Sequence, residues 1–286
     1  MIQQDQIMAL YKEACICDVQ AFKPGNVSVY NEGHDMTVDD FILSAEVSSS
    51  AIANVAYSLG EKIYYAVKAT REAVACNTNL GIILLAAPLC QAAYLQKEGQ
   101  TLRESLAQVL ENTTIADADW AFKAITLAAP GGLGESNEQD VGEVAAVSLV
   151  QAMEIASEKD RIAKQYTTIY KDIFEFSILR YNDVFVKFDD RAWAASAVFT
   201  GLLSKFPDSH IERKYGDKYS GWVRKQIITV DDALLDTSTP EQLIPKLHEV
   251  DRMFKDKGIN PGTTADLTVA TVLVILMEAL SVRSTS

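Results

Sequence analysis

The sequence predicts an all-α protein that folds as a single compact, bundle-like domain over residues 1–286. Apolar residues recur with the three-to-four spacing of helices along most of the chain, and no stretch keeps the alternation of a β-strand. Short polar junctions rich in Gly and Pro separate the helical stretches, without an internal repeat or a low-complexity linker. Two domains of about 150 residues would also fit this length, but one domain can bury a substantial core.

The composition is that of an ordinary globular protein, with 48% hydrophobic and 23% charged residues. The formal net charge of −13 argues against a nucleic-acid or anionic-membrane partner, because both require a basic surface. The N-terminus lacks the basic start and apolar core of a signal peptide. The most apolar run, Leu267 to Met277, is shorter than a membrane span. We therefore expect a cytoplasmic protein.

The cysteines form no C-x-x-C pair, and the three histidines are too scattered for a zinc site. We expect the thiols to be reduced and mostly buried. They are Cys15, Cys17, Cys76 and Cys90.

A helix is predicted over Gln4 to Gln20, and it leads into the loop Lys23-Pro24-Gly25-Asn26-Val27-Ser28. The segment Gly33-His34-Asp35-Met36 follows shortly after. Proline and glycine disfavour regular helix in both segments, so a loop presents their polar side chains. Loops on a helical frame often carry function, although a solvated turn is the alternative for any one of these residues.

The pattern Thr37-x-x-Asp40 is a variant of the capping box, and it predicts a helix that starts there and stops at Gly60. Another helix is predicted over Glu61 to Ala75. The junction Asn77-Thr78-Asn79-Leu80-Gly81 precedes a third, Ile82 to Leu95, which is apolar nearly all round at first and therefore central.

Two readings of the Asn77 to Gly81 junction are open. Thr78 or Asn79 can cap the following helix. Amides at the positive end of a helix can also bind an anion or a ribose. Within that helix Pro88 removes one backbone hydrogen bond, and we expect a kink there.

A helical pair, Leu102 to Leu110 and Thr114 to Leu127, precedes the glycine-rich loop Ala129-Pro130-Gly131-Gly132-Leu133-Gly134. Such a loop lets backbone approach a ligand closely, but no strand precedes it and it matches neither the dinucleotide nor the P-loop pattern. Asp140 follows in the first turn of the next predicted helix. Its negative charge can stabilise the positive end of the helix dipole, or it can belong to a functional site.

The segment Lys159 to Arg180 is predicted to be one helix, and we assign it no catalytic or binding residue. A further helix is predicted over Ala192 to Leu203. In the next segment, Asp208 to Gly216, the pattern puts Arg213 and Lys214 at the start of a helix, where the dipole disfavours cations. An anionic ligand would relieve that misfit. Pairing with Glu212 or Asp217 is the alternative.

The last junction, Asn260-Pro261-Gly262-Thr263-Thr264-Ala265-Asp266, opens the apolar helix Leu267 to Leu280. Thr263 or Thr264 can cap this helix. Asp266 lies on the same face as Val269 and Leu273, and a carboxylate beside so apolar a face needs a partner.

These junctions resemble, in order and across nearly the whole chain, the family of triphosphoribosyl-dephospho-CoA synthases. The resemblance implies an all-helical enzyme that joins the triphosphoribosyl group of ATP to the ribose 2′-hydroxyl of 3′-dephospho-CoA and releases adenine. The segment between Ser28 and Met36 is short, as in the homologues of methanogens and methylotrophs. The acceptor could therefore be another cofactor precursor, such as a tetrahydromethanopterin-type intermediate. The matching motifs are Lys23 to Ser28, His34 to Met36, Asn77 to Gly81, Pro130 to Gly134 with Asp140, Pro207 to Ser209 with Arg213 and Lys214, and Asn260 to Asp266.

Cleavage of an N-glycosidic bond requires a carboxylate near C1′, a proton donor for adenine and a base for the attacking hydroxyl. A triphosphate requires Mg²⁺ on oxygen ligands together with Lys or Arg. We assign Asp35, His34 and Asp140 to catalysis, with Asp35 as the base or C1′ stabiliser, and Asp140 and Asp35 as candidate Mg²⁺ ligands. The residues assigned to nucleotide and phosphate binding are Lys23, Asn26, Ser28, Asn77, Asn79, Gly131, Gly132, Arg213, Lys214, Thr263 and Thr264.

Two other functions are open from the sequence. One is a non-catalytic nucleotide-binding protein that kept the fold, and the other is a hydrolase that releases adenine from ATP alone. Apolar, all-helical chains of this kind often pair, so a homodimer is a further expectation.

Overall fold

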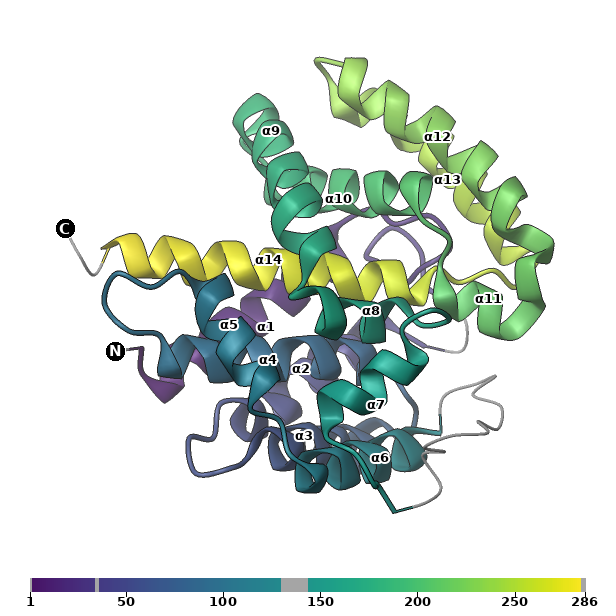
Figure 1. Cartoon of the computed structure of the whole chain (residues 1–286). Coiled ribbons are helices and arrows are strands. Elements are labelled where there is room, and N and C mark those ends of the chain that lie inside the picture. Colours follow the sequence, from purple (N-terminus) through teal and green to yellow (C-terminus); the bar gives the residue numbers. More distant parts are fainter. Residues whose placement is uncertain (1, 34–35, 130–143, 284–286) are drawn as a thin grey trace.

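The computed structural model describes residues 2–33, 36–129 and 144–283, with side chains described as far as residue 280. Its regular elements are helices (Figure 1). Two isolated antiparallel bridges, Ser28–Asn31 and Gly33–Met36, are the only β-type pairs among the described residues. The all-α prediction is confirmed.

Seventeen helical segments are described, three of them short π or 3₁₀ turns. In order they are α1 Gln4–Gln20, α2 Val38–Ile52, α3 Leu59–Val74, α4 Leu80–Leu95, α5 Leu102–Glu111, α6 Ile115–Ala128, α7 Leu149–Ala156, α8 Arg161–Thr168, the π-helix η1 Ile173–Ser177, α9 Ile178–Phe188, α10 Arg191–Lys205, α11 Ser209–Tyr215, η2 Gly216–Tyr219, α12 Ser220–Asp236, η3 Pro240–Leu243, α13 Ile244–Lys255 and α14 Gly262–Arg283.

The last helix, α14, crosses the middle of the molecule (Figure 1). α1 and α4 pack against it, and α10 covers it from the other side. α12 and α13 form an outer pair beyond α10, while α3 and α6 pack together at the opposite edge. The C-terminal helix is therefore the axis around which earlier parts of the chain assemble.

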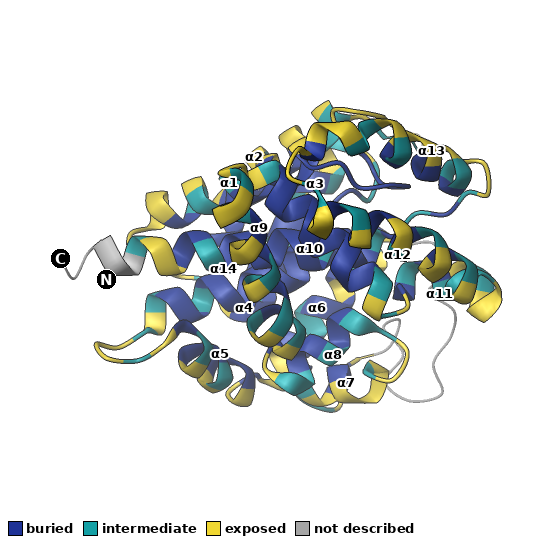
Figure 2. Ribbon diagram, turned by 90° about the horizontal axis from the view of Figure 1, so that it is seen from above, coloured by how far each residue is buried: buried dark blue, intermediate teal, exposed yellow. Residues whose placement is uncertain are grey.

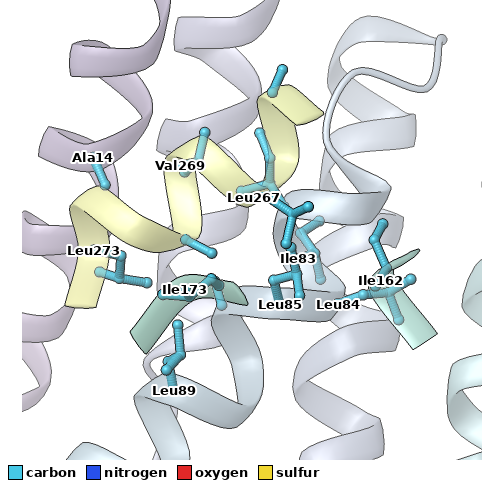
Figure 3. Packing of buried hydrophobic residues seen from close by; sticks show 14 of the residues in the cluster. Ala14, Ile83, Leu84, Leu85, Leu89, Ile162, Ile173, Leu267, Val269 and Leu273 are labelled. Atoms are coloured by element: carbon cyan, nitrogen blue, oxygen red, sulfur yellow. The ribbon is translucent and has the colours of Figure 1, made fainter. Parts of the chain in front are cut away.

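The core surrounds α14 and α4, as the apolar character of both helices predicts. Leu267 and Leu273 of α14 lie near Ile83 and Leu89 of α4, together with Ile173 from η1 (Figure 3). Dark, buried residues fill the middle of the molecule, and exposed residues lie on the outer faces (Figure 2). Removing each large aliphatic side chain from water contributes about 1.5–3 kcal/mol.

Part of α14, Gly262–Leu280, is long and apolar enough to cross a membrane, and this stretch is longer than the apolar run expected from the sequence. Inside the fold 72% of its apolar window is buried. A central core helix of a globular protein has the same properties.

The predicted stop at Gly60 is wrong. α2 ends at Ile52, and Ser58 caps the next helix, so Gly60 lies inside the first turn of α3. Its N–H donates to Asp117 Oδ1 at 2.8 Å, and a Cβ on Gly60 would lie 2.6 Å from the Cα of Asp117. The glycine permits close packing of α3 on α6 rather than ending a helix.

The single helix predicted over Lys159 to Arg180 is also wrong. α8 ends at Thr168, and the two following residues, Ile169 and Tyr170, both have φ of +52°. The chain then continues through η1 into α9.

The predicted capping box at Thr37 and Asp40 is confirmed. All four cysteines are free thiols, and three of them are buried.

Helix α4 continues through Pro88, and a side chain from another helix replaces the hydrogen bond that the proline cannot make. Proline has no N–H, so the carbonyl of Leu84, four residues earlier, has no donor within the helix. The buried hydroxyl of Tyr166 donates to that carbonyl at 2.6 Å. The hydroxyl of Tyr170 donates to the next carbonyl, that of Leu85, at 3.0 Å.

We expect Tyr166→Phe to destabilise the fold by about 1–3 kcal/mol, because the buried carbonyl of Leu84 then has no donor. Tyr170→Phe is the matched control, since the carbonyl of Leu85 keeps its place in the helical ladder. Urea unfolding followed by circular dichroism measures both. Equal losses in the two variants would contradict this role for Tyr166.

Candidate active site

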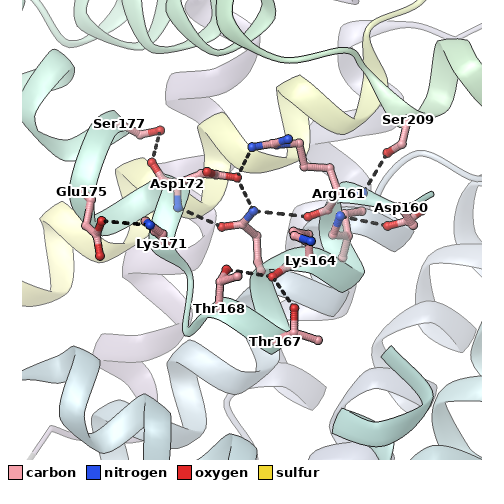
Figure 4. Close-up of polar contacts among 12 residues, drawn as sticks. Asp160, Arg161, Lys164, Thr167, Thr168, Lys171, Asp172, Glu175, Ser177 and Ser209 are labelled. Carbon is pink, nitrogen blue, oxygen red and sulfur yellow. Dashed lines mark hydrogen bonds and ion pairs between the residues drawn. The ribbon is translucent and has the colours of Figure 1, made fainter. Parts of the chain in front are cut away.

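The N-termini of four helices, α4, α8, α11 and α14, meet at one place, which we call the N-terminal junction. Asp208, at the start of α11, accepts hydrogen bonds from the N–H and Oγ1 of Thr264 in α14, both at 2.7 Å. The Ser209 hydroxyl accepts from the N–H of Arg161 in α8 at 3.2 Å (Figure 4). It donates to Thr263 Oγ1 in α14 at 3.1 Å. Sequence segments more than 180 residues apart thus converge.

Helix α4 joins the junction through Gly81, its second residue. A Cβ on Gly81 would lie 2.0 Å from Oδ2 of Asp266 in α14 and 2.8 Å from Cδ1 of Ile162 in α8. No side chain other than hydrogen fits this position without displacing the Asp266 carboxylate. Glycine is therefore required where the carboxylate contacts the helix.

At the starts of α4 and α14, three backbone N–H groups have no hydrogen-bond partner among the described residues. They belong to Gly81 and Ile82 in α4 and to Thr263 in α14. The first N–H groups of a helix have no acceptor within the helix and lie at the positive end of its dipole. Such groups bind anions.

Asp208 connects α11 to α14 through hydrogen bonds. Its side chain is buried, and besides the two bonds from Thr264 its Oδ1 accepts from the N–H of Ile211 at 3.1 Å. Burial raises the pKa of this carboxyl, while the hydrogen bonds from Thr264 and Ile211 act in the opposite direction. Both oxygens are thus engaged within the protein.

Asp266 differs from Asp208, because its carboxylate makes no hydrogen bond or ion pair with any residue that the structure describes. Its side chain is enclosed by protein on most sides yet keeps some exposure to solvent. Burial raises the pKa of this carboxyl well above its ordinary value, and the carboxylates of Asp208 and Asp18 add to the increase. Arg213 and Lys23 oppose it.

The loop after α1 packs its polar groups into the protein. Lys23 is completely buried, forms an ion pair with Asp18 and donates to Asn26 Oδ1 at 2.9 Å. Asn26 in turn donates to Asn260 Oδ1 at 2.8 Å, which joins this loop to the one before α14. The hydroxyl of Ser28 is buried and has no partner among the described residues.

Helix α13 fixes the same loop from the side. Oδ1 of its Asp251 accepts from the N–H of Gly25 at 2.8 Å, and its other oxygen accepts from Asn31. Gly25 has a φ of +83°, and a Cβ there would lie 2.9 Å from the Phe254 ring. Glycine is required by both the backbone conformation and the space.

The junction before α4 presents its amides inward. Asn79, one of the two predicted candidates, is the N-cap residue of α4, but its side chain makes no capping hydrogen bond. Asn77 Oδ1 instead accepts from the N–H of Leu80 at 3.2 Å. The hydroxyl of Thr78 shares a hydrogen bond of 2.6 Å with Ser44. The amide of Asn79 lies 3.4 Å from the Ser44 carbonyl and from the Ser48 hydroxyl.

Arg213 and Lys214 do not start a helix, so that prediction is wrong. Helix α11 begins at Ser209, and both cations lie in its last turn, where the dipole favours them. Arg213 forms an ion pair with Asp160, which itself caps α8, and so neither partner expected from the sequence is used. Lys214 is exposed.

Several assigned residues lie outside the described part of the chain. Within that part, no three His, Cys, Asp or Glu side chains are grouped as metal ligands. The assigned Mg²⁺ ligands cannot be compared with the described carboxylates, and their roles stay predictions. The residues outside are His34, Asp35, Gly131, Gly132 and Asp140.

Of the assigned binding residues that the structure describes, the two threonines, Arg213 and Asn77 make hydrogen bonds or ion pairs with the helices of the junction. Lys23 and Asn26 lie in the adjoining loop network, and Asn77 and Asn79 lie at the start of α4. Sequence reasoning assigned no role to four carboxylates: Asp18, Asp160, Asp208 and Asp266. A carboxylate on an otherwise apolar face was the signal for Asp18 and Asp266, and a position before a helix was the signal for the other two.

Comparison with protein families is decisive for the identity of the chain. Residues 4–285 match the model of the ATP:dephospho-CoA triphosphoribosyl transferase family. The chain belongs to this family. It is therefore a transferase, whose family moves the triphosphoribosyl group of ATP to dephospho-CoA.

A solved structure has the same fold as this transferase. It is that of an Archaeoglobus fulgidus protein provisionally assigned as a triphosphoribosyl-dephospho-CoA synthase. The two share 23% sequence identity with a TM-score of 0.64, over 82% of this chain and 97% of the other. No curated protein sequence matches this transferase significantly.

Proposed function

We propose that this transferase binds the triphosphate of ATP at the N-terminal junction and transfers the triphosphoribosyl group to dephospho-CoA there. The observation that carries this proposal is the set of unpaired N–H groups of Gly81, Ile82 and Thr263 at the N-terminal ends of α4 and α14. Each helix N-terminus carries about half a positive charge, and several of them together favour a polyanion.

Two guanidinium groups border the junction and support the same assignment. Arg161 pairs with Asp172 at 2.7 Å (Figure 4). It also stacks on Phe206, with 3.4 Å between the guanidinium carbon and the ring centroid. Arg213 pairs with Asp160. The Nε atoms of both arginines are buried without a partner among the described residues. The ion pairs hold both charges in place, and these charges would attract phosphate oxygens bound beside them.

We infer that Mg²⁺ accompanies the triphosphate. The oxygen donors of phosphate and carboxylate suit this ion, and bound Mg²⁺ would neutralise charge on the triphosphate. Asp35 and Asp140 remain the candidate ligands. Pairing of two copies and a cytoplasmic location also stay predictions.

Adenine release tests the proposed function. The purified chain is incubated with ATP and Mg²⁺, with and without 3′-dephospho-CoA, and free adenine is separated by chromatography. We expect adenine to appear only when dephospho-CoA is present. Release from ATP alone would indicate hydrolysis, and no release in either sample would contradict the proposal.

We expect Arg213→Gln to raise the KM for ATP by about tenfold, because it removes one charge beside the triphosphate. The value of kcat should change less, since the reacting ribose lies at the other end of the triphosphoribosyl group. Arg252→Gln, which changes an exposed arginine on α13, is the matched control. Steady-state kinetics with varied ATP measures both, and an unchanged KM in Arg213→Gln would contradict a phosphate contact.

A further inference from the structure

We propose that Asp266 is the general acid that gives its proton to adenine as the base leaves the ribose. This inference rests on the proposed function and adds a catalytic residue to it. Asp266 stands in the first turns of α14, against Gly81 at the start of α4. It therefore lies beside the N–H groups that would hold the phosphates, within reach of the sugar attached to them.

Among the described carboxylates at the junction, Asp266 is the one without a hydrogen bond or ion pair to the protein, so it can contact a ligand. Both oxygens of Asp208 accept hydrogen bonds from Thr264 and Ile211. Asp160 is bonded to Arg213 and to the N–H groups of Ile162 and Ala163 in the first turn of α8. Asp18 is paired with Lys23. Asp266 has no such bond, and it keeps some exposure to solvent, so a substrate can reach it.

The surroundings keep a proton on Asp266. The helices packed around it bring Asp208 from α11 and Asp18 from α1, and burial adds to their effect in raising the pKa. The cations Arg213 and Lys23 oppose this effect but are paired with Asp160 and Asp18. A bound triphosphate would add further negative charge nearby. A neutral carboxyl can donate a proton, whereas a carboxylate cannot.

The proposed step balances as follows. The C1′–N9 bond of ATP breaks, its electron pair passes to the adenine ring, and the proton of Asp266 moves to a ring nitrogen, so that neutral adenine departs. The 2′-hydroxyl oxygen of dephospho-CoA forms the new bond to C1′ and loses its proton to solvent. Asp266 regains a proton from solvent. No oxidant or reductant takes part.

The test compares two nucleotides in the wild type and in Asp266→Asn, which keeps the shape but has no acidic proton. With ATP we expect kcat to fall by about 10²–10⁴-fold, with little change in KM. In 7-methyl-ATP the base already carries a positive charge and leaves as a neutral molecule without protonation. We therefore expect the two proteins to differ by less than about tenfold on this substrate, after subtraction of its spontaneous decay.

The matched control is Asp232→Asn, which changes an exposed carboxylate on α12 and should match the wild type on both nucleotides. Circular dichroism monitors folding of each variant. Equal losses on ATP and 7-methyl-ATP would overturn the acid role, as would full activity of Asp266→Asn on ATP. A wild type that releases no adenine with dephospho-CoA would instead refute the proposed function, so the two failures are distinguishable.

Discussion

Lys23→Met is expected to lower the free energy of unfolding by about 3–5 kcal/mol, the cost of leaving one partner of a buried ion pair without the other. Lys23 is completely buried, and its partner Asp18 is 2% exposed. One oxygen of Asp18 already has no hydrogen-bond partner among the described residues, so the remaining bond to Lys23 is important. The variant also removes the hydrogen bond from Lys23 to Asn26, which weakens the contact between the loop that contains Asn26 and the loop that contains Asn260.

Thermal and urea unfolding measure this loss. The matched control is Lys12→Met, which breaks the ion pair of Lys12 with Glu46 at 3.1 Å, where both side chains are substantially exposed. That change should cost less than about 1 kcal/mol. The double variant Lys23→Met with Asp18→Asn should recover part of the loss, because it removes the unpaired charge. Wild-type stability of Lys23→Met would show that the buried pair does not support the fold.

Gly81→Ala is expected to reduce activity by about 100-fold or more with a much smaller effect on stability. The new methyl group would occupy the space of the Asp266 carboxylate, since an ideal Cβ lies 2.0 Å from its Oδ2. The end of a side chain can move aside, so the fold accommodates the change. The carboxyl is then displaced by an ångström or more from its position, which is enough to cost this much in rate.

Gly221→Ala is the control for this variant. Gly221 is likewise the second residue of a helix, α12, and a Cβ there would contact nothing within 4 Å. We expect it to keep full activity and to change stability by at most about 1 kcal/mol. Adenine release and thermal unfolding are measured for both variants. Equal activities would mean that the position of Asp266 does not matter for turnover.

The sequence predicts the helical class and the location of the polar junctions well, because both depend on local patterns. The apolar faces of α4 and α14 identify the two central helices, and the capping box at Thr37 marks the start of α2. The boundaries near Gly60 and Arg213 were predicted incorrectly. In each case a polar residue before the helix, Ser58 or Asp208, starts the element earlier than the later glycine or cations suggest.

The pairing of polar groups could not be predicted, because it depends on contacts between distant segments. Lys23 carries the charge expected of a phosphate ligand, but its contact with Asp18 depends on how the chain turns after α1. The bonds from Thr264 to Asp208 join residues 56 positions apart. Asp266 could be recognised from the sequence as a carboxylate in need of a partner, whereas its contact with Gly81 required the fold.

A crystal structure with an ATP analogue that cannot react tests the central claim most directly. The analogue 9-deaza-ATP has a carbon–carbon glycosidic bond, so the base cannot leave. We predict that its phosphates contact the N–H groups of Gly81, Ile82 and Thr263, and that Asp266 lies within about 4 Å of the sugar or base. A triphosphate bound elsewhere, with Asp266 remote from the glycosidic bond, would contradict the account.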